Sequence, residues 1–204
     1  MLASDNIWKD AQKFLFKDKY IGPLIKKYDP CKIKPRTKKN YFEDLVDAIT
    51  GQQLSGKAAR TIFERVKTKC GGKITPEKLK ELTIEELRKC GLSYAKCSYV
   101  KDLADKVLSK ELQVTKLGKL PDEEVMQELI AVKGIGRWTS EMFLMFTLAR
   151  QDVFPVDDLG IGKGMQKLLK RKIKSQNMAK FAERWKPYRT LAAWYVWEIV
   201  DNAN

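Results

Sequence analysis

The amino-acid sequence predicts an all-α protein built from two helical lobes. Apolar residues recur at helical spacing along nearly the whole chain, and no convincing segment alternates between apolar and polar residues as a half-buried strand would. Breaks that contain glycine or proline separate the helical segments. With 204 residues, 44% of them apolar, the chain can bury a core as one large domain or as two small ones that share a cleft.

The first half of the chain contains five predicted helices. Four apolar residues between Phe42 and Ile49 fall on one helical face, and a second apolar face runs through Ala58–Val66. The stop at Cys70–Gly72 ends that second helix, since glycine is the usual left-handed terminator. Before them, the segment Cys31–Asn40 is basic and interrupted by proline, which favours a surface connection.

Three of these five helices follow in close succession. Two short helices begin after Thr75-Pro76 and after Thr83, and the second ends near Gly91. A longer helix covers about Ala95–Leu108 and has its own apolar stripe.

The second half continues the helical pattern. Leu120–Asp122 opens a helix whose acidic first turn suits the helix dipole, and this helix ends at Lys133–Gly136. A helix that begins near Trp138 is predicted to show one apolar face, formed by Met142, Met145, Phe146 and Ala149. A short helix follows Asp157 and Asp158, and two more complete the chain. The last helix has apolar residues around most of its circumference and is therefore expected to be mostly buried.

The charge and residue usage narrow the classes of function. Forty Lys and Arg against 26 Asp and Glu give a net charge of +14, which favours a polyanionic partner such as DNA or RNA over a membrane surface or a merely soluble basic protein. Histidine is absent, which excludes histidine-ligated metals, Ser/His and Cys/His nucleophile pairs, and histidine as a general base.

The four cysteines do not have the spacing of a metal or cluster site. Cys31, Cys70, Cys90 and Cys97 form neither the paired knuckles of a zinc site nor the clustered ligands of an iron–sulfur cluster. With no secretory signal they are expected to be reduced thiols in a cytoplasmic (nucleoid) or nuclear protein. No apolar run approaches the roughly 20 residues that a membrane span needs.

The most informative stretch is the hairpin Val132–Arg137 between two predicted helices. Two glycines spaced two apart, Gly134 and Gly136, let the backbone turn with positive φ and let a ligand approach the main chain. The free N–H groups of the second helix and the basic Lys133 and Arg137 make an anion site. A bare G-x-G is more often an ordinary glycine-capped corner, so the flanking residues decide the interpretation.

In the stretch Leu129–Thr139, the apolar Leu129, Val132 and Ile135 are predicted to lock the two helices together. This stretch resembles the helix–hairpin–helix motif of base-excision DNA glycosylases, the HhH-GPD superfamily. The segment Phe154–Gly160 is similar to the Gly/Pro turn and aspartate of that family, and Phe42–Ser55 to its DNA-inserting loop. Ala182–Arg189, followed by a Trp-rich helix, resembles the 3-methyladenine (alkylpurine) branch. The likeness covers about residues 40–200, and it rests on three separated motifs in the right order.

The resemblance implies one HhH-GPD unit over residues 1–204, with two helical lobes that flank a DNA-binding cleft. The approximate lobes are residues 35–118 and residues 1–34 plus 119–204. The implied partner is double-stranded DNA with damaged bases, bound by a monomer. The implied DNA-binding residues are Gln52, Gln53, Leu54, Ser55, Lys133, Gly134, Ile135, Gly136, Arg137 and Thr139.

The family pattern assigns the catalytic role to Asp158 and leaves Asp157 as a helix N-cap. An alkylated purine is cationic and leaves without a general acid, so one carboxylate that stabilises the sugar cation or activates water is enough. Relatives that also nick the strand carry a lysine where this chain has Trp138, and Lys133 and Lys163 are off-register. The resemblance therefore implies base removal without lyase activity.

The resemblance also implies a pocket for the flipped base and a plug for the duplex. Trp138, Trp197 and Met142 occupy pocket positions, whereas Trp185 and Trp194 are expected to be core residues. Among the loop residues, Gln53 and then Leu54 are the predicted wedge. The family further implies a Na⁺ or K⁺ ion on the backbone carbonyls of Ile130, Val132 and Gly134, with no zinc or iron–sulfur cluster.

Two alternatives remain open at this point. Helix–hairpin–helix pairs also occur in non-catalytic DNA-binding modules. A related glycosylase for oxidised or mismatched bases is the other alternative, although the missing hairpin lysine and cluster cysteines disfavour it.

Overall fold

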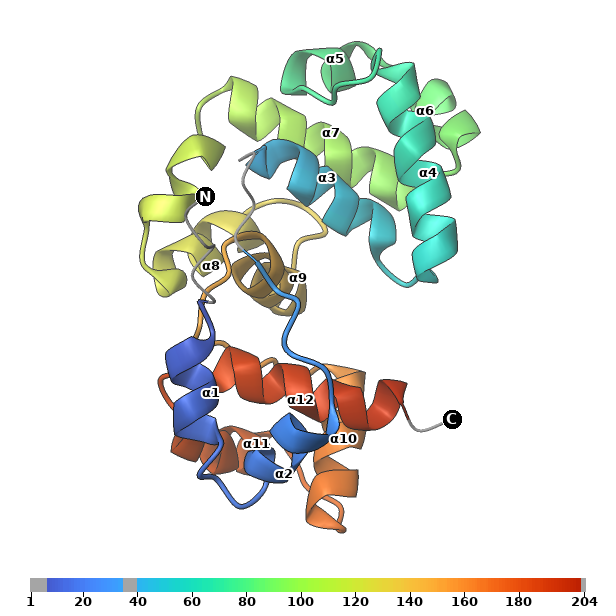
Figure 1. Cartoon of the computed structure of the whole chain (residues 1–204). Coiled ribbons are helices and arrows are strands. Elements are labelled where there is room, and N and C mark those ends of the chain that lie inside the picture. The colour runs from blue at the N-terminus through green and yellow to red at the C-terminus, as the bar shows by residue number, and fades with distance from the viewer. Residues whose placement is uncertain (1–6, 35–39, 203–204) are drawn as a thin grey trace, which may run out of the picture. The chain divides into compact units, whose positions relative to one another are not determined.

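The structure, a computed structural model, describes residues 7–34 and 40–202, and this part of the chain contains helices and no β-strand (Figure 1). The predicted all-α fold is confirmed. The chain divides into two compact units. Met1–Pro35 and Leu144–Asn204 form what we call the terminal unit, and Arg36–Phe143 forms the central unit. No helix of the described residues is long and apolar enough to cross a membrane.

The central unit contains the predicted helices of the first half and the hairpin. Its helices are α3 (Tyr41–Gly51), α4 (Gly56–Lys69), α5 (Pro76–Glu81), α6 (Ile84–Cys90), α7 (Tyr94–Leu108), the 3-10 helix η1 (Val114–Lys119), α8 (Asp122–Ile130) and α9 (Arg137–Met142). Side chains that accept backbone N–H groups start several of them, as Thr75 does for α5 and Thr83 for α6. Apolar faces then bury Leu45, Val66 and Leu103 in the core.

The boundary between the units differs from the expected one. The sequence suggested a break near residue 118, which would place the hairpin with the chain ends. In the structure η1 packs on α3 and α8 packs on α9, so these elements, together with the hairpin, belong to the central unit.

The terminal unit joins the two ends of the chain. Its helices are α1 (Lys9–Leu15), α2 (Ile21–Lys27), α10 (Leu159–Leu169), α11 (Ser175–Ala182), the 3-10 helix η3 (Glu183–Trp185) and α12 (Arg189–Asp201). The largest helix contact joins α10 to α12, and Gly164 permits it because a Cβ there would lie 2.4 Å from the carbonyl oxygen of Val196. The predicted burial of α12 is confirmed along its first half, where Leu191 and Tyr195 are fully buried.

One predicted helical face is wrong. The chain from Phe143 to Thr147 forms a π-helix, η2, and not a continuation of α9. A π turn contains more residues than an α turn, so it rotates the following side chains relative to the expected face. Of the expected face Met145 and Ala149 are buried, but Ala149 lies beyond the helix and Phe146 is exposed.

The cysteines and the basic connection Cys31–Asn40 agree with the sequence where they are described. All four cysteines are free, and burial raises the pKa of the Cys31 thiol to about 12. In the basic connection Cys31–Asn40, residues 35–39 lie outside the described part of the chain. Asn40 at its end caps α3, because its side-chain oxygen accepts the N–H of Glu43.

Candidate functional site

The hairpin between α8 and α9 needs glycine at one of its two glycine positions. Gly134 has a φ of 76°, and a Cβ on it would lie 2.1 Å from the ring of Tyr99. Gly136 instead has an extended backbone, with a φ of −100°, so the expectation of positive φ is wrong for this residue. Nothing lies within 4 Å of a Cβ built on Gly136, and the backbone there is open to a large ligand.

Buried residues and one carboxylate from α7 hold the hairpin in place. Val132 and Ile135 are 1% and 3% exposed, which confirms the predicted apolar lock. The carboxylate of Asp102 accepts the backbone N–H of Lys133 at 2.9 Å, and it lies 3.7 Å from the ammonium group of the same residue. Local sequence patterns did not mark Asp102, because its partner is 31 residues away.

The turn Gln52–Ser55 between α3 and α4 carries the predicted wedge. Gln53 is exposed and has a φ of 57°, and Leu54 is 41% exposed, so both side chains are available to a ligand. Gln52 has a different position: its Nε2 donates to the carbonyl oxygen of Gly134 at 2.8 Å and to the hydroxyl of Thr139 at 3.2 Å. The wedge turn and the hairpin are therefore joined directly.

Lys96 on α7 supports the same turn. Its Nζ donates to the carbonyl oxygens of Thr50 at 2.8 Å and of Gln52 at 2.6 Å. A cation suits the C-terminal end of α3, where backbone carbonyls lack helical partners. Burial lowers the pKa of the Lys96 ammonium group. No local pattern marks Lys96 for this role, since it is one of 40 basic residues.

The predicted DNA-binding residues of the hairpin separate into buried and exposed members. Ile135 and Thr139 are buried and help to hold the hairpin together. Lys133 and Arg137 are exposed, and Arg137 Nε donates to Glu141 at 2.9 Å, which fixes one edge of the guanidinium. Trp138, on the first turn of α9, is 41% exposed.

In the terminal unit, Asp158 is held at the start of α10. Its Oδ1 accepts the backbone N–H of Ile161 at 2.9 Å and the indole N–H of Trp197 at 2.8 Å. Asp158 is thus the N-cap of α10, and the assignment of that cap to Asp157 is wrong. Asp157 is exposed and does not cap the helix.

Close packing between α10 and α12 sets the position of this carboxylate. A Cβ on Gly160 would lie 2.8 Å from Cδ1 of Trp197 and 3.0 Å from Oδ1 of Asp158, so only glycine leaves room for their hydrogen bond. The indole of Trp197 also stacks on Phe146, with the ring centres 5.9 Å apart. Trp197 was predicted as a pocket residue, but its neighbours Gly160 and Phe146 were not predicted from the sequence.

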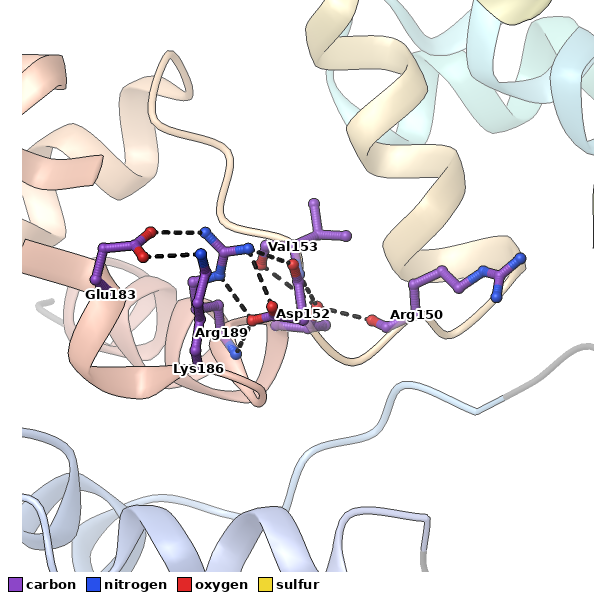
Figure 2. Close-up of polar contacts among 7 residues, drawn as sticks. Arg150, Asp152, Val153, Glu183, Lys186 and Arg189 are labelled. Atoms are coloured by element: carbon purple, nitrogen blue, oxygen red, sulfur yellow. Dashed lines mark hydrogen bonds and ion pairs between the residues drawn. The ribbon is translucent and has the colours of Figure 1, made fainter. Parts of the chain in front are cut away.

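A polar cluster fastens the segment before Asp158 to α12 (Figure 2). Arg189 donates from Nε to Oδ1 of Asp152 at 2.7 Å and also contacts Glu183 at 3.3 Å. The neighbouring Thr190 is fully buried, and its hydroxyl donates to the carbonyl oxygen of Arg150 and accepts the N–H of Val153. The start of α12 therefore fixes the start of the segment that ends at Asp158.

The predicted pocket residues come from both units. Trp138 and Met142 belong to the central unit, where Met142 is half-buried. Asp158 and Trp197 belong to the terminal unit, where they form a hydrogen bond.

A helical protein with a glycine hairpin, an adjoining wedge turn and a helix-capping aspartate belongs to the helix–hairpin–helix class of DNA-binding proteins. The family model of the HhH-GPD superfamily of base excision DNA repair proteins matches residues 46–188. The chain belongs to this superfamily, as its motifs predicted.

Named relatives place the chain within a branch of that superfamily. It is 37% identical over 191 residues to "DNA-3-methyladenine glycosylase 1" of Schizosaccharomyces pombe, covering 91% of this chain and 83% of the relative. It is 34% identical over 205 residues to "alkylbase DNA glycosidase-like protein mag2" of the same yeast, covering 97% and 96%. The predicted 3-methyladenine branch is confirmed by these matches.

A solved structure supports the same placement. The 3-methyladenine DNA glycosylase Mag1 of Schizosaccharomyces pombe, in complex with abasic DNA, superimposes with a TM-score of 0.79 and 34% identity. The match covers 94% of this chain and 97% of that protein.

Proposed function

We propose that this protein is a DNA glycosylase that removes alkylated purines from duplex DNA and leaves the strand intact. The observation that carries the proposal is Asp158, a carboxylate fixed by a helix N–H and by the indole of Trp197. The names of the relatives support the same substrate class, because they are 3-methyladenine glycosylases and an alkylbase glycosidase-like protein.

The proposed chemistry needs one oriented carboxylate. An alkylated purine carries positive charge and is a good leaving group, so rupture of the glycosidic bond places positive charge on the sugar. A carboxylate fixed before the reaction stabilises that charge without reorganising, and it can orient the attacking water. In this proposal the sugar of the target nucleotide lies against Asp158, and water takes the place of the released base.

The proposal includes base removal without a lyase step. A lyase of this superfamily uses an amine as a Schiff-base nucleophile near the hairpin. This chain has Trp138 at that place. The nearby Lys133 is fixed to Asp102 through its backbone N–H and lies within ion-pair distance of the same carboxylate.

In this proposal, the residues that hold the DNA duplex belong to the central unit. Gln53 and Leu54 fill the space left by the flipped nucleotide, and the exposed Arg137 and the open backbone at Gly136 meet a phosphate. In the terminal unit, Trp197 beside Asp158 stacks on the cationic base, which indole rings bind well, and the exposed Trp138 stays a predicted pocket residue of the central unit. Gln52 acts through the hairpin rather than on the DNA, since its amide already binds Gly134 and Thr139.

We also propose a monovalent cation at the hairpin. Of the expected ligands, the carbonyl of Val132 accepts the N–H of Ile135 at 3.1 Å, and that of Gly134 accepts Gln52. A carbonyl oxygen has two lone pairs, so these two oxygens and that of Ile130 fit Na⁺ or K⁺ as additional ligands. The bound ion would supply positive charge beside a DNA phosphate.

The deciding experiment is base release by Asp158→Asn. Purified protein is incubated with methylated, hypoxanthine-containing and 8-oxoguanine-containing duplexes, and strand nicking is scored separately. We expect release from methylated DNA without nicking, a loss of at least about a hundredfold in Asp158→Asn, and little change in the control Asp157→Asn. Equal release by Asp158→Asn and the parent protein would show that Asp158 is not catalytic, and no release by the parent protein would indicate a non-catalytic DNA-binding module.

A further inference from the structure

The segment from Leu159 to Ala182 is uniformly basic. It contains seven Lys or Arg residues and no Asp or Glu, so it holds half of the net charge of +14 within 24 residues. The hairpin and the wedge turn are in the central unit, whereas this segment covers α10 and α11 of the terminal unit. The charge is therefore separate from the DNA-binding elements described above.

The basic side chains of this segment are exposed and have no acidic partners. The six from α10 to the start of α11 are all solvent-exposed: Lys163, Lys167, Lys170, Arg171, Lys172 and Lys174. Among the described residues, none of these six forms an ion pair, while other lysines of the same unit, such as Lys13 and Lys186, do. Their charges are thus available to an external anion.

Two of these charges share one face of α10, and a third follows at its end. Leu159, Lys163 and Lys167 follow one another at intervals of four residues, which places them on the same side of the helix, and Lys170 is the C-cap of α10. With a rise of 1.5 Å per residue the row from Leu159 to Lys167 is about 12 Å long. It begins next to Asp158, where Leu159 is 81% exposed.

Two adjoining hollows connect this face to Asp158. The first is lined at one end by Asp157 and Asp158 and further on by Lys163 and Lys174, together with Gln166 and Ile173. The second shares Gln166, Ile173 and Lys174 with the first and continues to Arg171 and Lys172. A positively charged path therefore leads from the carboxylate along α10 to the loop between α10 and α11. We call it the basic track.

We propose that the basic track binds the phosphate backbone of the DNA strand that flanks the nucleotide at Asp158. This inference rests on the proposed function. It adds a second DNA-binding surface besides the hairpin. Flexible lysine and arginine side chains spaced along a helix suit repeated phosphates and do not depend on base sequence. DNA fits better than an acidic protein because the track starts at the carboxylate that would face the sugar.

The test removes charge at the far end of the basic track. The triple variant Lys167→Gln, Arg171→Gln, Lys172→Gln spares the residues that line the hollow around Asp158. Its matched control removes three exposed charges elsewhere in the terminal unit, through Lys9→Gln, Lys13→Gln and Lys17→Gln. Binding to an undamaged 30-base-pair duplex is measured between 50 and 200 mM salt, and circular dichroism checks the fold.

The track variant should bind the duplex more weakly than the control. The slope of the logarithm of its binding constant against the logarithm of the salt concentration should be shallower by about 0.9 per lost phosphate contact, or up to about 2.7 in all. At saturating protein its single-turnover base release should match the parent. Equal affinity and slope in the two triple variants would overturn the proposal and favour an acidic protein as the partner.

The binding result does not depend on excision, because the duplex carries no damaged base. The two proposals can therefore fail separately. If the track variant binds DNA more weakly but the parent protein releases no base, the proposed function is disproved and the basic track is still a DNA-binding surface.

Discussion

The indole N–H of Trp197 donates to Oδ1 of Asp158 at 2.8 Å, and this bond joins the last helix of the chain to the first turn of α10. The sequence marked Trp197 only as an aromatic surface for a flipped base. The structure gives it a second task, which is to orient the carboxylate. In the proposed mechanism, a substitution at Trp197 would therefore alter catalysis through Asp158 even where base stacking is preserved.

Trp197→Phe tests this second task. Phenylalanine keeps a ring beside Phe146 but has no N–H, so Asp158 loses one of the two bonds to Oδ1. A hydrogen bond to a charged group contributes about 1.5–3 kcal/mol, so the single-turnover rate of base release should fall about tenfold to a hundredfold. An unchanged rate would show that the indole N–H does not orient Asp158.

Gly160→Ala tests the packing around the same bond. The added methyl would lie 2.8 Å from the Trp197 ring, so the indole must shift and base release should fall by about tenfold or more. The matched control is Gly162→Ala, where nothing lies within 4 Å of the new methyl. This control should keep its activity and gain about 0.5–1 kcal/mol in the free energy of unfolding, measured by urea denaturation.

Gln52 and Gln53 should behave differently although they are neighbours. Gln52→Ala removes the bonds to Gly134 and Thr139, so the free energy of unfolding should fall by about 1–3 kcal/mol. Gln53→Ala should leave stability almost unchanged, because this side chain is exposed. If Gln53 is the wedge, its variant should instead lower base release, as measured by single-turnover kinetics on a methylated duplex.

Glu86 on α6 should give a pH-dependent contribution to stability. Its pKa is lowered below 4.5 by the hydrogen bond from the Thr83 backbone and then by Lys69, so the ionised form is favoured on folding. The stabilisation should be present above pH 4.5 and lost as the pH falls through the lowered pKa. The difference in Tm between the parent and Glu86→Gln should therefore shrink on acidification. A constant difference would contradict this origin.

The helices could be predicted from the sequence because their signals are local. Apolar spacing, capping residues such as Thr83 and the stop near Gly91 all lie within a few residues of the element that they define. The π-helix after Met142 was missed because no such local signal marks it: the apolar residues alone fit an α-helix as well.

The candidate site was predicted in part. The motif order gave Asp158, the hairpin and the wedge turn, and the structure places each at the end of a helix. Gln52, Lys96 and Asp102 act through partners that lie 31 to 87 residues away, and no local pattern reveals such contacts. The N-cap of α10 was assigned to the wrong aspartate because Asp157 and Asp158 are adjacent, and an aspartate suits both a helix N-cap and a catalytic position.

The segment from Asp152 to Asp158 is fastened to α12 at both ends, by Arg189 at its start and by Trp197 at its finish. A chain tethered in this way gives up its conformational entropy when the protein folds, before any DNA is bound. In the proposed function, the ordering of the carboxylate would then already be complete at the encounter with the damaged strand, and binding free energy would remain available for turning the nucleotide out of the helix.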